Sequence, residues 1–143
     1  MLAPKKVKHR KWHTGREHAS KQLSPETRGI KLSFGSYGMK SLTYARITSN
    51  QIESARKVLV RELGKTGKVW IRIFPDWPIT QKPPEVKLGK GKGDPVAFVT
   101  RVYPGRIIFE VDGVESAIAK KAIIKAGKKL PVTVKVVGRE ITI

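Results

Sequence analysis

Apolar residues recur at helical spacing in two stretches of the chain, and the first stretch has clear signals at both ends. Its apolar positions are Ile52, Ala55, Leu59 and Leu63. Thr48 and Gln51 have the three-residue spacing of a capping box, and Gly64 stands where a helix commonly ends. The pattern predicts a helix from about residue 49 to residue 63, with Lys57 and Arg61 on the side opposite the apolar one.

The second helical stretch runs to about Lys129, and Asp112 with Glu115 predicts another capping box at its start. Its apolar side is formed by Ile118, Ala122 and Ala126, broadened by Ala119 and Ile123, while Lys121, Lys125 and Lys128 line the far side. The apolar side offers only alanines and isoleucines. It therefore lacks the large apolar anchors of a helix that binds a membrane surface.

Strands are predicted where apolar and polar residues alternate and where β-branched and aromatic residues form short runs. In chain order they cover residues 30–34, 44–47, 68–74, 96–103, 106–111 and 132–136. Gly35, Tyr37 and Gly38 indicate a bend between the first two strands. Pro104-Gly105 predicts that the fourth and fifth strands pair as a hairpin. This mixture predicts the α+β class, with two helices packed on a mostly antiparallel sheet in a single domain over residues 30–143.

Residues 75–95 are predicted to form a long loop that protrudes from this domain. They contain prolines at 75, 78, 83, 84 and 95 and the run Gly89-Lys90-Gly91-Lys92-Gly93. No regular element fits this composition, and a loop of about 20 residues inside a compact domain usually has a function. Glycines allow the backbone to approach a phosphate chain closely while lysines neutralise it. We therefore expect the loop to contact a polyanion.

Residues 1–29 are predicted to form a basic arm followed by a hinge. The first 16 residues contain six Lys or Arg residues, and the first acidic residue is Glu17. Aliphatic residues are sparse after Leu2, so this arm cannot bury a core of its own. We expect it to be disordered in the free protein and to become ordered on RNA. Ser24, Pro25 and Gly29 indicate a hinge into the globular part.

The charge of the whole chain favours a polyanionic partner. Among 143 residues, 30 Lys and Arg stand against 11 Asp and Glu, which gives a formal net charge of +19. Such a charge destabilises a compact protein by self-repulsion unless a polyanion neutralises it, so nucleic acid is the first candidate and an anionic membrane the second. The sequence contains no cysteine, which excludes disulfides and zinc-thiolate sites, and no apolar run long enough to span a membrane.

No motif in the sequence predicts an enzyme, a cofactor or a metal site. Gly64-Lys65-Thr66 imitates the end of a phosphate-binding loop, but Leu59 occupies the position of its first glycine. His9, His13 and His18 all lie in the basic arm, where the surrounding cations oppose a metal ion and favour contact with phosphates or bases. The acidic residues Asp76, Glu85 and Asp94 are expected to form ion pairs.

The three tryptophans have different expected roles. For Trp12, which stands among the cations of the arm, we favour stacking on a nucleobase over the alternative of a hydrophobic anchor on the protein's own body. Trp70 lies in an apolar strand and is expected in the core, whereas Trp77 fits either environment.

Several blocks of residues resemble one family over nearly the whole chain. They are residues 1–5 and the basic residues 7–11, Phe34-Gly35-Ser36-Tyr37-Gly38, residues 47–48 and 51–56, residues 68–76, Lys82-Pro83, residues 89–93 and Lys129-Leu130-Pro131. In this order they resemble the bacterial large-subunit ribosomal protein sixteen family, also called L-sixteen. The resemblance includes the first five residues, so the arm is expected to belong to the mature protein.

The resemblance implies a structural constituent of the large ribosomal subunit, in the bacterial cytoplasm or, as an alternative, in an organelle. Members of the family bind large-subunit (23S-type) rRNA beside neighbouring ribosomal proteins and support late subunit assembly. They approach the A-site tRNA, and approach to the P-site tRNA stays open. Membrane partners are not implied. Composition alone leaves a non-ribosomal RNA-binding assembly factor or chaperone as the alternative.

The residues expected to bind rRNA are cationic or aromatic and come from the arm, the first long helix, a strand and the loop. They are Lys5, Lys6, Lys8, His9, Arg10, Lys11, Trp12, Arg16, Arg56, Lys57, Arg61, Arg72, Lys82, Lys87, Lys90 and Lys92. Gly89, Gly91 and Gly93 are expected to let the backbone approach RNA closely. The family usually has Arg-Met before the run of glycines and lysines, and this chain has Lys87-Leu88, which removes the bidentate contact that a guanidinium makes.

Overall fold

The computed structural model describes residues 2–13 and 19–139 of the chain. In chain order its elements are α1 (Ala19–Leu23), β1 (Tyr37–Ser41), β2 (Ala45–Thr48), α2 (Ser49–Leu63), β3 (Lys68–Ile71), β4 (Trp77–Gln81), β5 (Asp94–Val102), β6 (Ile107–Asp112), α3 (Ser116–Gly127) and β7 (Val134–Gly138). The strands form a four-stranded sheet in the order β3-β6-β1-β7 and a three-stranded sheet in the order β2-β5-β4. All described strand pairs are antiparallel. The predicted α+β class is confirmed, and the short helix α1 is added to the two helices expected.

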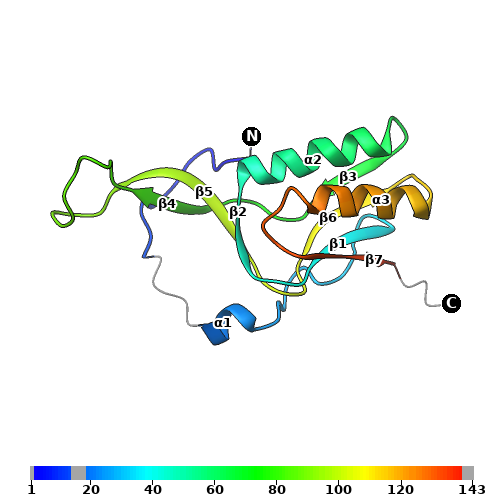
Figure 1. Cartoon of the computed structure of the whole chain (residues 1–143), viewed down its shortest axis with the longest axis horizontal. Coiled ribbons are helices and arrows are strands. Elements are labelled where there is room, and N and C mark those ends of the chain that lie inside the picture. Colours follow the sequence, from blue (N-terminus) through cyan, green and yellow to red (C-terminus); the bar gives the residue numbers. More distant parts are fainter. Residues whose placement is uncertain (1, 14–18, 140–143) are drawn as a thin grey trace.

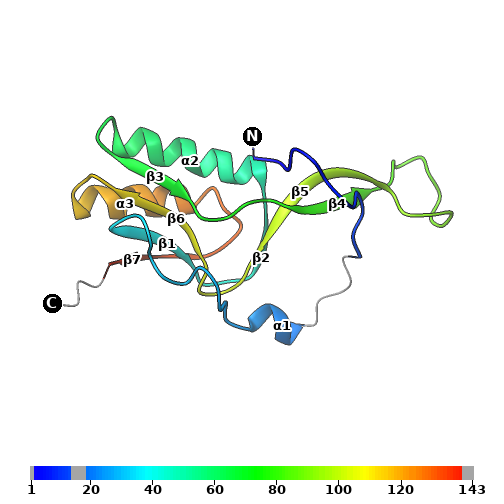
Figure 2. The same ribbon diagram turned by 180° about the vertical axis from the view of Figure 1, so that it is seen from behind.

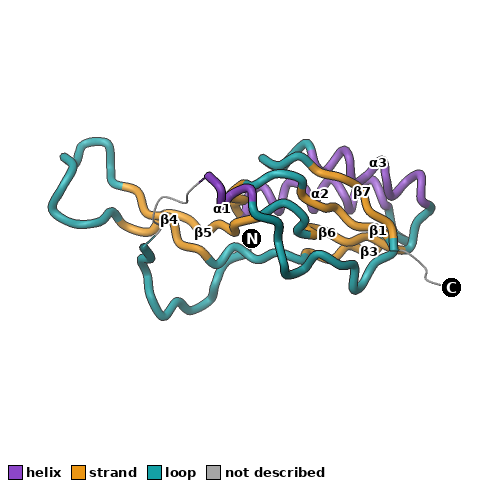
Figure 3. The backbone as a smooth tube through the Cα atoms, turned by 90° about the horizontal axis from the view of Figure 1, so that it is seen from below, coloured by secondary structure: helices purple, strands orange, loops and turns teal. Residues whose placement is uncertain are grey.

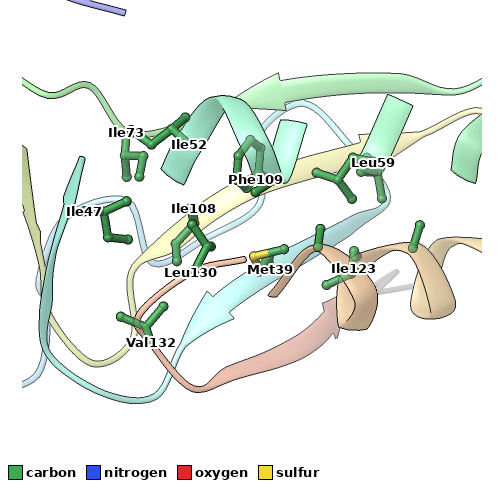
Figure 4. Close-up of a cluster of buried hydrophobic side chains, with 14 of the residues drawn as sticks. Met39, Ile47, Ile52, Leu59, Ile73, Ile108, Phe109, Ile123, Leu130 and Val132 are labelled. Carbon is green, nitrogen blue, oxygen red and sulfur yellow. The ribbon is translucent and has the colours of Figure 1, made fainter. Parts of the chain in front are cut away.

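The core lies between the two long helices and the four-stranded sheet. Helices α2 and α3 run side by side over one face of that sheet (Figure 1), and Figure 3 shows the same layers from below. The buried helix residues are Ile52, Ala55, Leu59, Leu63, Ala119, Ala122, Ile123 and Ala126. Met39 and Phe109 reach them from the sheet, and both are fully buried (Figure 4). Ile118, which the spacing places on the same side of α3, is exposed.

Helix α2 begins and ends as its sequence predicts. The Thr48 hydroxyl accepts a hydrogen bond from the Gln51 N–H at 3.4 Å, and the Gln51 side chain accepts one from the Thr48 N–H at 3.0 Å, which completes the capping box. Gly64 ends the helix at φ 68°, and its N–H donates to the Val60 carbonyl. Both caps satisfy backbone groups that a helix end leaves without a partner.

Helix α3 starts without the predicted capping box. Its N-cap is Glu115, which makes no side-chain hydrogen bond to the helix, and the helix runs only to Gly127. Asp112 ends strand β6 instead, and its carboxylate accepts a hydrogen bond from the Ser36 hydroxyl at 2.8 Å. This bond and one from the Gly113 N–H lower the pKa of Asp112 below its ordinary value. Asp112, which was predicted to cap α3, instead holds the segment before β1 against the end of β6.

The first predicted strand is wrong, and the real strand begins inside the predicted bend. Residues 30–34 form no strand, whereas β1 begins at Tyr37 and pairs with both β6 and β7. Leu32 lies against Gly38 in the sheet, and the Phe34 ring stacks on Trp70 with centroids 6.2 Å apart. Residues 30–34 therefore cover the face of the sheet opposite the helices. Trp70 is half-buried under this cover instead of lying in the main core.

The predicted hairpin around Pro104-Gly105 is also wrong, although the turn is present. Strands β5 and β6 belong to different sheets, so the turn carries the chain from one sheet to the other. The Glu26 N–H donates to the Pro104 carbonyl at 2.8 Å, and the Ile107 N–H donates to the Gly29 carbonyl at 2.9 Å. The expected hinge residues thus pack on this turn and connect the arm to the body.

The long loop is shorter than predicted, because β4 occupies part of it. Residues 77–81 and 94–99 pair as a two-stranded extension, which we call the stalk, and it carries residues 82–93, which we call the loop. Figures 1 and 2 show stalk and loop extending away from the helices. Val96 near the start of β5 is 59% exposed, whereas Val99 is buried, so the strand enters the core only at its second half.

Candidate nucleic-acid interface

The arm, residues 2–13, has one side that faces the body and one that faces solvent. It contains no helix or strand. The partly buried residues are Leu2, Pro4, Val7 and Trp12, and the exposed ones include Lys5, Lys6, Lys8, His9, Arg10 and Lys11. Leu2 packs against the hydrophobic core. The sparse apolar residues thus hold the arm to the body, and its predicted RNA-binding cations are left accessible. Arg16 lies outside the described residues.

The end of the arm contacts the stalk through aromatic rings. The ring centroids of Trp12 and Trp77 lie 4.9 Å apart with planes inclined at 71°, which is an edge-to-face pair. The guanidinium carbon of Arg101 lies 3.5 Å from the centroid of the Trp77 ring, as in a cation–π contact. In the free protein Trp12 is therefore an anchor on the protein's own body, the alternative that the sequence analysis did not favour.

Polar contacts join the arm and the end of the loop at the same place. The Lys11 ammonium donates to the Lys92 carbonyl at 3.2 Å and lies 3.4 Å from a carboxylate oxygen of Asp94. The Lys92 ammonium in turn donates to the Trp12 carbonyl. Asp94 thus forms the kind of ion pair that the sequence predicted for it. Two predicted RNA-binding lysines also have partners within the protein.

The loop exposes most of its lysines on an unusual backbone. Lys87, Lys90 and Lys92 are exposed, whereas the ammonium of the half-buried Lys82 donates to the Gly89 carbonyl. Gly89, Lys90 and Gly91 have φ angles of 99°, 54° and 101°. Three consecutive residues with positive φ are rare outside glycine-rich turns. The glycines are thus required by the shape of the loop tip itself.

Gly93 is required for a different structural reason from Gly89 and Gly91. A Cβ atom at Gly93 would lie 2.6 Å from the carbonyl carbon of Gln81, whereas nothing lies within 4 Å of one at Gly89 or Gly91. Gly93 therefore lets the two strands of the stalk approach each other where the loop begins. This contact within the protein accounts for the glycine that the sequence analysis assigned to an RNA approach.

On helix α2 the predicted cations divide into paired and outward-facing ones. Arg56 donates two hydrogen bonds to the carboxylate of Glu53, at 2.6 and 2.9 Å. This pairing lowers the pKa of Glu53 and raises that of Arg56. Lys57 and Arg61 are exposed on the side of the helix away from the core. They provide a small basic patch on the outer side of α2.

Arg72, also predicted to bind RNA, belongs to a buried cluster around Glu110. The Arg72 guanidinium forms an ion pair with the fully buried Glu110 carboxylate and lies 5.3 Å from the centroid of the Phe34 ring. The same carboxylate accepts hydrogen bonds from the backbone N–H groups of Ser33, Phe34 and Gly35, at 2.6 to 3.2 Å. Glu110 therefore fastens residues 33–35 to the sheet, and Arg72 compensates its charge.

These contacts determine the pKa of Glu110. Burial raises it, but the hydrogen bonds from Gly35, Phe34, Ser33 and Arg72 together lower it by more, so the pKa lies below its ordinary value. The carboxylate is stable as an anion inside the protein because both of its oxygens accept hydrogen bonds, one of them from a guanidinium. This cluster was not predicted from the sequence. Its signal was an acid in the otherwise apolar run from Ile107 to Val111.

Neither a metal centre nor a membrane helix is found in the described part of the chain. Within residues 2–13 and 19–139, no three His, Cys, Asp or Glu side chains are placed to hold a metal ion together. None of the helices there is long and apolar enough to cross a membrane. The features that the arrangement does offer are exposed cations on the arm, on the loop and on α2.

Comparison with known proteins gives one consistent family. The model of the family described as ribosomal protein L16p/L10e matches residues 4–137. The large ribosomal subunit protein uL16 of Rhodopseudomonas palustris (strain BisB18) is 50% identical over 139 residues, which cover 97% of this chain and 98% of that protein. Those of Zymomonas mobilis and Rickettsia massiliae are 50% and 52% identical and also cover 97% of this chain, with 94% and 98% of their own lengths.

These matches confirm the resemblance that the ordered blocks of the sequence indicated. The family model extends through the arm from residue 4, through both sheets and through the loop, and among the described elements it leaves out only the last residue of β7. Since the family model and relatives of at least 50% identity span almost the whole chain, this chain belongs to the ribosomal protein L16p/L10e family.

Proposed function

We propose that this protein is a structural constituent of the large subunit of the bacterial ribosome, where it binds large-subunit rRNA and neighbouring ribosomal proteins. The observation that carries the proposal is its membership in the L16p/L10e family. The arrangement of charge supports it, because two basic segments far apart in sequence meet at the stalk. The three relatives described above all carry the name large ribosomal subunit protein uL16.

The charge of these segments fits contact with RNA phosphates. The described arm holds five Lys or Arg residues and no acid, and the loop holds four lysines and one glutamate. Cations of this density gain most from a nucleic acid because each phosphate contact releases a condensed counterion. Exposed lysines on an irregular backbone read the shape and charge of folded RNA and not its sequence.

The loop is the segment we assign to the tRNA side of the site. It extends farthest from the helices at the end of the stalk (Figures 1 and 2), and Leu88 at its tip is 95% exposed. A slim protrusion held by the body of the protein is suited to reach past rRNA to a ligand bound nearby. We therefore propose that the loop approaches the A-site tRNA and that the protein supports late assembly of the subunit.

Salt-dependent binding tests the rRNA assignment. Affinity for a large-subunit rRNA fragment is expected to fall linearly on a plot of log K against log salt, with a slope of roughly −0.7 to −0.9 per phosphate neutralised. Replacing Lys57 and Arg61 with glutamine is expected to make the slope shallower by at most about 2. The matched control replaces Lys120 and Lys121 on α3, outside the proposed interface, and is expected to leave the slope nearly unchanged.

Fractionation of a cell lysate on sucrose gradients tests the ribosomal assignment separately. A structural constituent stays with the large-subunit peak at both low and high salt, whereas an assembly factor leaves mature subunits at high salt. A flat salt plot would refute phosphate binding. Loss of the protein from the subunit peak at high salt would refute the structural role and favour the assembly factor.

A further inference from the structure

The contact between Trp12 and Trp77 connects the two basic extensions of the protein. We propose that Trp12 is a positioning residue: by packing on Trp77 it holds the arm against the stalk before RNA binds, so that the cations of arm and loop form one preassembled polyanion-binding surface. The effect of this contact on RNA affinity rests on the function proposed above. The position of the arm against the stalk in the free protein does not depend on that function.

The geometry of the aromatic contact is that of a specific pair. The rings of Trp12 and Trp77 meet edge to face with centroids 4.9 Å apart, an arrangement that aromatic pairs prefer over a face-to-face stack. Trp77 is itself fixed, because it lies in β4 opposite Val99 and under the guanidinium of Arg101. A ring held by a strand and a cation offers Trp12 a rigid partner.

Polar contacts determine where the arm lies once the rings have met. Lys11 binds the carbonyl of Lys92 and pairs with Asp94, while Lys92 binds the carbonyl of Trp12. Two consecutive arm residues are thus tied to Lys92 and Asp94, where the loop joins the stalk. The start of the arm is held independently, since Leu2 packs against the core near Ile71 and Ile73. The arm is therefore fixed at both described ends.

Charge explains why an aromatic contact is needed. The arm and the loop are both strongly positive, so they repel each other when no polyanion is present. Asp94 offsets part of this repulsion, but its side chain is 86% exposed, and an exposed ion pair contributes little and is screened by salt. The packing of Trp12 on Trp77 is insensitive to salt. It is consequently the contact that keeps the arm closed under physiological conditions.

A closed arm lowers the cost of binding RNA. A flexible basic arm must give up its conformational freedom when it binds, and that loss reduces the affinity. An arm already placed beside the loop has lost this freedom during folding. Removal of the Trp12 ring should therefore weaken binding without changing the number of phosphates that the protein contacts.

The first experiment examines the free protein by NMR. A nuclear Overhauser effect between the indole rings of Trp12 and Trp77 is expected, together with restricted backbone motion in residues 3–11. The W12A substitution should mobilise the arm, the W12F substitution should largely keep it in place, and H13A, at an exposed neighbouring residue, should change nothing. Absence of the ring contact in the wild-type protein overturns the proposal, whether or not the protein binds rRNA.

The second experiment measures affinity for the rRNA fragment at several salt concentrations. W12A is expected to weaken binding about twofold to tenfold, the range an aromatic pair accounts for, with an unchanged salt slope. K8A should instead make the slope shallower by about one phosphate. A change in slope with W12A would overturn the proposal.

A double-mutant cycle separates positioning from direct stacking of Trp12 on a base. Under the proposal, Trp77→Leu weakens binding as much as W12A, and the double variant is no weaker than either single one. If Trp12 stacks on RNA instead, Trp77→Leu has little effect and W12A weakens binding while the arm of the free protein stays ordered. Circular dichroism is used to check whether Trp77→Leu is folded. If this variant does not fold, the mobility of the arm in free W12A protein decides between positioning and direct stacking.

Discussion

The buried carboxylate of Glu110 offers a sharp test of how the sheet is held to the segment that covers it. The perturbation is Glu110→Gln, which keeps the shape of the side chain and replaces one oxygen with an NH2 donor. One carboxylate oxygen accepts from Arg72, the other accepts from Phe34 and Gly35, and the Ser33 N–H is shared between the two. Whichever oxygen becomes NH2 therefore faces donors, and at least one hydrogen bond is replaced by a repulsive contact.

The expected loss of stability follows from the burial and the number of donors. Glu110 is fully buried, and removing one partner of a buried ion pair costs about 3–5 kcal/mol because the other charge is left without compensation. Total stabilities of domains are roughly 5–15 kcal/mol, so this is a large fraction. At about 2–4 °C per kcal/mol for a protein of this size, the melting temperature should fall by ~10 °C.

Replacing Arg72 should cost less than replacing Glu110. In Arg72→Met the carboxylate keeps three backbone N–H donors, whereas Glu110→Leu leaves all three N–H groups without an acceptor. An unsatisfied buried donor costs about 1–3 kcal/mol, and of these three bonds only that of Gly35 is fully buried, so the two substitutions should differ by about 1–3 kcal/mol. The asymmetry distinguishes a backbone-binding carboxylate from a simple ion pair, in which both replacements would cost the same.

The assay is urea unfolding at a series of pH values. The pKa of Glu110 is lower in the folded protein than its ordinary value of 4.5, so its contribution to stability is fully present above that value and is lost as the pH falls through the folded-state pKa. Wild-type protein should lose stability there, and Glu110→Gln should lose less. Glu62→Gln, at the more accessible carboxylate paired with Lys125, is the control and should change little. A loss below about 1 kcal/mol in Glu110→Gln, with an unchanged acid limb, would refute the reasoning.

Two further predictions concern local structure. Thr48→Ala removes one half of the capping box of α2 and should lower the stability by about 1 kcal/mol in thermal unfolding; an unchanged melting temperature would show that the cap is dispensable. Gly93→Ala should lower the melting temperature because its Cβ collides with the backbone of Gln81, whereas Gly91→Ala strains only the exposed tip and should leave the melting of the body unchanged. The opposite order of effects would contradict the assignment of Gly93 to the base of the loop.

The sequence predicted helix α2 and both of its caps because every signal involved is local. Thr48 and Gln51 are three residues apart, and Gly64 is four residues from the carbonyl that its N–H binds. The turn at Pro104-Gly105 was predicted for the same reason. The pairing of the strands on either side of this turn was predicted wrongly, because pairing depends on tertiary contacts between strands far apart in sequence.

Alternation misled the strand prediction at residues 30–34 for a physical reason. A segment that lies flat on a sheet turns alternate side chains toward it, so Leu32 and Phe34 alternate without any ladder of hydrogen bonds. At Pro78 the error was the opposite one: a real strand was predicted to be loop, since proline is unfavourable inside most strands. Strand β4 lies at the edge of its sheet, where a missing N–H is tolerated, and the sequence does not reveal which strand is the edge.

For the candidate interface, the sequence identified cations by type but not by what they bind. Arg56, Arg72 and Lys11 were grouped with the exposed lysines, yet each has an acidic partner in the structure. The partner of Arg56 is three residues away and is readable as a helical pair. Those of Arg72 and Lys11 lie 38 and 83 residues along the chain, and only folding brings them together.

One of these distant pairs still had a signal that follows from electrostatics. Arg72 interrupts the apolar run from Val69 to Phe74, and Glu110 interrupts that from Ile107 to Val111. A lone charge in a buried strand is unfavourable unless an opposite charge or several donors compensate it. Two such strands with opposite charges satisfy both requirements by pairing, and β3 and β6 are indeed neighbours. Isolated opposite charges in two apolar strands therefore predict that the strands are neighbours in the sheet.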